Sequence, residues 1–73
     1  MNAQVQLDKI DLRVLEVLQA DGRATYDQIA EKVGLSPSAT LRRVKRLEES
    51  GVIAGYVALV QPERVGLTLT AYI

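Results

Sequence analysis

Four positively charged side chains fall within the five residues 42–46, namely Arg42, Arg43, Lys45 and Arg46. The chain as a whole is neutral, with nine Lys and Arg against nine Asp and Glu. Residues 36–47 hold four bases and no acids, whereas residues 8–31 hold six acids and three bases. Clustered Lys and Arg side chains bind anions, and on one face of a domain they are typical of nucleic-acid binding. The first chemistry to consider is therefore binding to a phosphate backbone.

Other kinds of chemistry find little support in the residue types. The 73 residues include no Cys and no His, which excludes thiol chemistry, disulfides, Cys/His metal sites and a His-based proton relay. There is no Gly-rich phosphate loop and no evident pair of carboxylates for general acid–base work. Thr25 and Ser36 are better explained as helix caps than as nucleophiles. We therefore expect no enzyme activity, no cofactor and no metal.

Apolar residues at helical spacing predict two helices before the basic segment. Asp8 is a good N-cap for the first, with Asp11 placed to complement the helix dipole, and Asp21-Gly22 ends it. Thr25 and Gln28 match a capping box for the second, and Gly34 ends it. The expected buried residues of these helices are Leu7, Ile10, Val14, Val17 and Leu18, then Tyr26, Ile29, Ala30 and Val33.

The basic segment lies on a predicted third helix. Ser36 caps this helix, Pro37 occupies its first position, and Gly51 closes it. Its inward stripe is Thr40, Leu41, Val44 and Leu47. The turn between the second and third helices contains Gly34 and a buried Leu35, so the two helices are predicted to form a helix-turn-helix.

The inward stripe determines where the charges point. At 100° per residue, Ser38, Arg42, Lys45, Arg46 and Glu49 project almost directly away from it, with Ala39 beside them and Arg43 on the flank. Small residues at the start of such a helix let it approach base edges in a major groove, while longer cations reach bases or phosphates. The sequence therefore predicts a DNA-binding surface made of Ser36, Pro37, Ser38, Ala39, Arg42, Arg43, Lys45 and Arg46.

Within that surface, the residue types indicate separate roles. Ser38, Ala39 and Arg42 are candidates for base edges, and Arg43, Lys45 and Arg46 for phosphates. Ser36 can offer its hydroxyl or the helix N-terminal amides to a phosphate.

Two other readings of the basic helix stay open. RRVKRLEE can be a solvated face on which Glu48 and Glu49 pair with cations one turn earlier. Alternatively, the domain is a winged-helix protein–protein interaction module that does not bind DNA. Such a module favours aromatic and aliphatic anchors, whereas this face carries Arg and Lys.

The period of the sequence changes after Gly51. Residues 52–60 are rich in β-branched side chains and predict a strand, Pro62 begins a break that runs to Gly66, and residues 67–73 alternate as a half-buried strand. The expected fold class is mainly α, a three-helix winged helix-turn-helix domain followed by C-terminal β-strands. Residues 1–6 are expected to be disordered.

Three segments resemble the leucine-responsive regulatory protein/AsnC family of transcription regulators: LDKIDLRVLEVLQADGR (7–23), IAEKVGLSPSATLRRVKRLEESGVIAGY (29–56) and PERVGL (62–67). The second is far more specific than a generic helix-turn-helix pattern. The resemblance implies that residues 7–51 form a DNA-binding domain with the third helix as its recognition helix. Residues 52–73 would then be a hinge strand and the start of a truncated effector domain.

The resemblance also bears on partners. Members of this family are about twice as long, and their second half dimerises and binds small effectors, usually amino acids. We therefore expect double-stranded DNA as partner, and an amino-acid effector only in a longer parent chain. Unpaired strands in 52–73 predict a homodimer through this region. No apolar run approaches the roughly 20 residues that span a bilayer, so a cytoplasmic location is expected.

Overall fold

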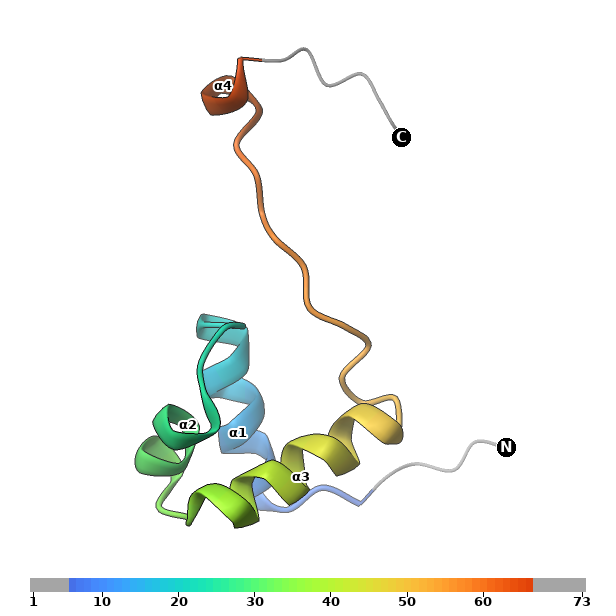
Figure 1. Cartoon of the computed structure of the whole chain (residues 1–73). Coiled ribbons are helices and arrows are strands. Elements are labelled where there is room, and N and C mark those ends of the chain that lie inside the picture. Colours follow the sequence, from blue (N-terminus) through green and yellow to red (C-terminus); the bar gives the residue numbers. More distant parts are fainter. Residues whose placement is uncertain (1–5, 67–73) are drawn as a thin grey trace, which may run out of the picture.

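The computed structural model describes residues 6–66 of the chain. Three helices, α1 (Lys9–Ala20), α2 (Tyr26–Val33) and α3 (Pro37–Glu49), pack against one another. A short helix, α4 (Pro62–Val65), lies well away from them at the far end of an extended segment (Figure 1). Among the described residues, no helix is long and apolar enough to cross a membrane.

The three predicted N-caps are confirmed. Asp8 accepts a hydrogen bond from the Asp11 amide at 2.8 Å, and the Asp11 carboxylate accepts one from the Asp8 amide at 3.1 Å. The Thr25–Gln28 capping box is also reciprocal. Ser36 accepts from the Ala39 amide at 3.2 Å. Each cap satisfies amides that have no partner inside the helix, which fixes where each helix begins.

The core lies where the three helices meet. Its buried apolar members are Val14, Ile29, Val33, Val44 and Leu47. Leu7, Ile10, Leu15, Val17, Leu18, Ala24, Leu35 and Ile53 cover it from the sides. The predicted stripe of the first helix therefore faces inward, as do Thr40, Val44 and Leu47 of the third. Leu41, also expected in that stripe, is only half-buried and does not belong to the core cluster.

The turn of the helix-turn-helix is short because Gly34 takes a left-handed conformation. Its φ is 80°, and its amide and that of Leu35 both bond back to the Ala30 carbonyl. This geometry strongly favours glycine, since a side chain at positive φ meets the following carbonyl oxygen. The turn brings α3 directly against α2.

Two expectations about apolar residues are wrong. Tyr26 was expected in the buried face of the second helix, but it remains 39% exposed. It stands at the first position of α2, at the rim of the three-helix unit. The strand predicted over 52–60 does not form either, and within residues 6–66 the structure contains no strand.

The absent strand has a physical cause. Residues 54–60 run extended, with Val57 85% and Leu59 93% exposed. β-branched residues favour strands because they fit a pleated, half-buried surface next to other strands. No such neighbour lies beside 54–60 among the described residues, so the segment stays unpaired. The second predicted strand, 67–73, falls outside the described residues, as does most of the 1–6 stretch expected to be disordered.

Candidate nucleic-acid interface

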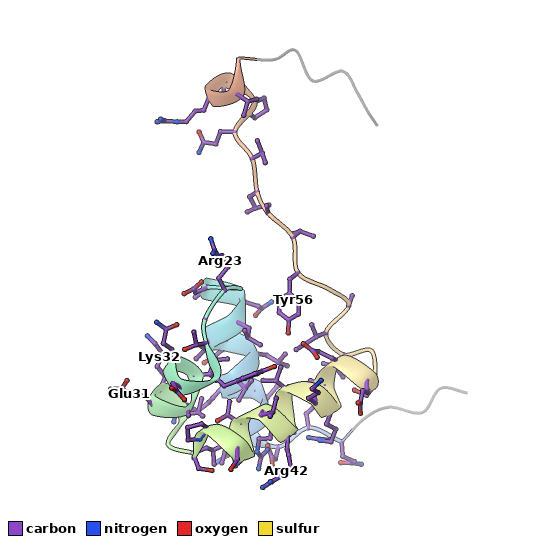
Figure 2. All side chains as sticks on the ribbon, in the orientation of Figure 1. Arg23, Glu31, Lys32, Arg42 and Tyr56 are labelled. Carbon is purple, nitrogen blue, oxygen red and sulfur yellow. The ribbon has the colours of Figure 1, made fainter. Side chains whose placement is uncertain are left out.

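Helix α3 presents its first turn to solvent, and Arg42, Lys45 and Arg46 are exposed further along it. Ser36, Pro37 and Ser38 are exposed, and Ala39 is half-buried beside them. Arg42 and Lys45 follow on the exposed surface. In Figure 2 the Arg42 side chain points away from the packed helices. These six residues, Ser36, Pro37, Ser38, Ala39, Arg42 and Lys45, are called the open face below.

The start of the open face has free hydrogen-bonding capacity. The Ser36 hydroxyl accepts the cap bond and lies 3.3 Å from the Ser38 hydroxyl. A hydroxyl carries one donor and two acceptor sites, so the pair keeps capacity for a partner. The small side chains here leave room for another molecule to approach the helix backbone.

Arg43 and Arg46 are placed differently from Arg42 and Lys45. Nη1 of Arg43 donates to both Asp8 oxygens at 2.8 and 2.9 Å and to Asp11 Oδ1 at 2.9 Å. Nη2 of Arg46 lies 2.5 Å from Asp11 Oδ2. Its Nη1 reaches the Gln6 carbonyl at 3.5 Å. Both guanidinium groups are therefore directed at the beginning of α1. The four residues Asp8, Asp11, Arg43 and Arg46 are called the clamp.

The clamp corrects the expectation that Arg46 projects directly away from the interior. Helical spacing gives the direction in which a side chain leaves the backbone, and an Arg side chain is long enough to turn from there toward a charge. The first turn of α1 offers such charges because its cap is built from two aspartates. Charge-assisted hydrogen bonds, three from Nη1 of Arg43 and one from Nη2 of Arg46, then hold the arginine heads at α1.

Electrostatics within the clamp follows from these contacts. The Asp11 amide, which donates to the Asp8 carboxylate, and then the Arg43 guanidinium lower the pKa of Asp8 below its ordinary value of 3.8. Hydrogen bonds to Asp8 and Asp11 raise the pKa of Arg43. Two carboxylates face two guanidinium groups, so the clamp is neutral as a whole. Within residues 6–66, Arg42 and Lys45 are the α3 cations that have no carboxylate partner.

The role of Asp11 was missed at the level of sequence, although a signal existed. Asp11 is four residues after Leu7 and three before Val14, so it lies on the inward face of its helix. It is fully buried. A carboxylate on an apolar face needs a charged or hydrogen-bonding partner. That requirement pointed to a cation from another element, but not to which one.

A second polar contact joins the extended segment to α3. The Tyr56 hydroxyl donates to Glu48 Oε2 at 2.7 Å. Partial burial and then the Glu48 carboxylate raise the pKa of Tyr56 to about 12. Glu48 was one of two acids considered as partners for the α3 cations; it is bonded to a tyrosine instead.

Residues 7–54 match a protein family described as winged helix-turn-helix DNA-binding. The chain belongs to this family. That finding speaks against the interaction-only module weighed above, since the family is described by its binding to DNA. The strands that give winged domains their name do not occur among residues 6–66.

The chain is similar to proteins named as transcription regulators. It is 49% identical over 72 residues to the leucine-responsive regulatory protein of Rhizobium meliloti, covering 99% of this chain and 46% of that protein. It is 46% identical over 68 residues to the Bkd operon transcriptional regulator of Pseudomonas aeruginosa, covering 93% and 44%. The chain thus spans less than half the length of these relatives.

Solved structures give the same result. A transcriptional regulator from Neisseria meningitidis, crystallised as a complex with L-Met, superposes with a TM-score of 0.80 at 50% identity, over 82% of this chain and 39% of that one. An AsnC family regulator from Agrobacterium tumefaciens gives 0.76 at 41% identity, over 81% and 39%. The resemblance to the leucine-responsive regulatory protein/AsnC regulators is confirmed, and these relatives are named as regulators.

Proposed function

We propose that this chain binds double-stranded DNA in a sequence-specific way through α3, and that it serves transcription regulation of the leucine-responsive/AsnC type. The observation that carries the proposal is the open face. It combines small residues at the start of an exposed helix with two cations that no carboxylate contacts within the described part of the chain. This is the arrangement that places a recognition helix in a major groove.

The roles within the open face follow from size and charge. Ser38, Ala39 and Arg42 lie near the N-terminal part of α3 and are proposed to face base edges. Arg42 has the fork of donors that recognises guanine. Lys45 lies one turn further on and is proposed to contact phosphate as a point charge. Ser36 and Pro37 bring the helix N-terminus close to the sugar–phosphate backbone.

We further propose that the protein acts as a homodimer in the cytoplasm. A single helix-turn-helix contacts few base pairs. Proteins of this kind usually gain specificity as dimers that bind two half-sites about one helical turn apart. The apolar side chains of Val57 and Leu59 are exposed in the extended segment and support self-association there. Sedimentation at high micromolar concentration tests this, and a purely monomeric chain would contradict it. An amino-acid effector enters only with a longer chain.

The experiment that tests DNA binding starts from selection of bound duplexes out of random DNA, followed by gel shifts at low salt. Arg42→Ala should weaken the selected duplex more than a mixed-sequence duplex, because base contacts carry specificity. Lys45→Ala should weaken both alike, because phosphate contacts do not. Equal losses on both duplexes in both variants would overturn these roles.

Arg23→Ala provides the matched control. Arg23 is exposed and lies at the opposite end of the three-helix unit from Arg42 (Figure 2). The variant removes the same charge without touching α3, so its binding should stay close to that of the unaltered chain. If Arg23→Ala lost as much binding as Arg42→Ala, the effect would be one of net charge and not of the open face.

A further inference from the structure

We propose that Asp11 is a positioning residue for DNA recognition. In this view the clamp keeps Arg43 and Arg46 bound to α1 while α3 is on the duplex, so that Arg42, at the base edges, and Lys45, at a phosphate, supply the positive charge that α3 brings to the DNA. The inference rests on the proposed DNA binding. It differs from the sequence-based expectation, in which Arg43 and Arg46 were themselves phosphate contacts.

The first support is the burial and saturation of the Asp11 carboxylate. Its side chain is about 1% exposed, whereas those of Arg43 and Arg46 are 27% and 46% exposed. Oδ1 accepts from Arg43 at 2.9 Å. Oδ2 accepts from Arg46 and, at 3.1 Å, from the Asp8 amide. Drawing either arginine onto a phosphate would leave a buried carboxylate short of a partner, which is costly.

The second support is the placement of the two arginines on α3. Arg43 and Arg46 are three residues apart, so their side chains leave the same side of the helix and converge on one carboxylate. The direct packing of α1 on α3 is the slightest of the three helix pairs. A two-armed ionic contact at this junction therefore limits rotation of α3 about its contact with α2. That rotation would turn Ser38, Ala39 and Arg42 relative to the bases.

The clamp also changes the charge available to DNA. A protein that neutralises Z phosphates shows a slope of log affinity against log salt of about −0.9Z on B-DNA. Two free cations on α3 give a slope of about −2 per bound domain, whereas four would give about −4. The salt slope therefore separates cations that displace counterions from the duplex from cations held inside the protein. A merely structural role for Asp11 would not move this slope.

The experiment measures affinity against salt for the full chain and for the double variant Asp8→Asn, Asp11→Asn, on the selected duplex and on a mixed-sequence duplex. The unaltered chain should give a slope near −2 per domain. In the double variant the freed arginines should steepen the slope toward about −4. The ratio of selected to mixed-sequence affinity should fall about tenfold, since α3 is no longer fixed.

Three further variants sharpen the test. Arg46→Gln should keep the slope near that of the unaltered chain but lose discrimination. Lys45→Gln should reduce the slope by about 1 and keep discrimination. Asp27→Asn, an exposed acid in the first turn of α2, is the matched control and should change neither. Circular dichroism at each salt concentration verifies that the compared variants are folded.

The possible outcomes are distinguishable. A slope near −4 for the unaltered chain would overturn the inference, as would a folded double variant with an unchanged slope. If the double variant does not fold, Asp8→Asn is tested alone. It removes the charge of an exposed carboxylate that Arg43 contacts, and an unchanged salt slope in this variant would count against the clamp. If the unaltered chain bound neither duplex at low salt, the proposed function itself would fail.

Discussion

The three-helix unit and the segment that follows it contain the same kinds of apolar residue, but these side chains are buried in the unit and exposed in the segment. In the unit, Leu47 and Val44 are buried between helices. In the segment, Leu59 and Val57 are almost fully exposed. Burial of an apolar side chain stabilises only if another surface covers it. The difference shows that hydrophobic residues specify structure in this chain where a second helix stands opposite them.

The largest effect is expected in the core of the unit. Leu47→Ala removes a fully buried side chain at the meeting point of all three helices and should lower the free energy of unfolding by about 3 kcal/mol. A domain of this size has a small free energy of unfolding to begin with. Urea unfolding followed by far-ultraviolet circular dichroism measures the change. A loss under about 1 kcal/mol would mean that α3 is not packed as described.

A smaller effect is expected at the turn that joins α2 to α3. Gly34→Ala should cost about 1 kcal/mol, because the backbone there has φ of 80°. An added Cβ would meet nothing within 4 Å, so the cost is conformational and not steric crowding by other residues. Gly55→Ala is the control: it also has open space but no positive φ, and it should be neutral or slightly stabilising.

The contact between the two regions should contribute less. Tyr56→Phe removes the hydrogen bond to Glu48 and should cost about 0.5 kcal/mol, since the residue is half exposed. The raised pKa means that any stabilisation is present below about pH 10 and is lost as pH rises toward about 12. A difference titration of tyrosine absorbance, unaltered chain minus Tyr56→Phe, should show a midpoint near 12. A midpoint near 10 would show that Tyr56 is solvated.

The smallest effect is expected in the segment itself. Leu59→Ala makes the same chemical change as Leu47→Ala, but at a side chain that is already in water. It should alter the free energy of unfolding by less than about 0.5 kcal/mol. Measured at low protein concentration, a loss as large as that of Leu47→Ala would erase the contrast between the two regions. A loss that appears only at high concentration would support self-association through the segment.

Much of the three-helix unit follows from local features of the sequence. Asp8, Thr25 and Ser36 act as caps because a short polar side chain before an apolar stripe satisfies nearby amides. Gly34 ends its helix because few other residues tolerate its backbone conformation. The burial of Tyr26 was predicted wrongly, because a residue at the first position of a helix can pack at the edge of a core as easily as at its centre.

The candidate site was only partly predictable for a related reason. Exposure of Ser38, Arg42 and Lys45 follows from the inward stripe of α3. The destinations of Arg43 and Arg46 depend on where the first turn of α1 lies, 35 residues or so away in the sequence for each pair. Likewise, a strand over 52–60 requires a neighbouring strand, which composition alone does not supply.

By itself, the sequence determined the three helices, their caps, the turn at Gly34 and the side of α3 that faces solvent. These depend on residues at most about four positions apart, within reach of one helical turn. Only the tertiary structure decided that two of the four α3 cations form ion pairs with Asp8 and Asp11. Ionic partners are chosen by distance in space, and a long arginine side chain reaches whichever carboxylate the packing of α1 brings near.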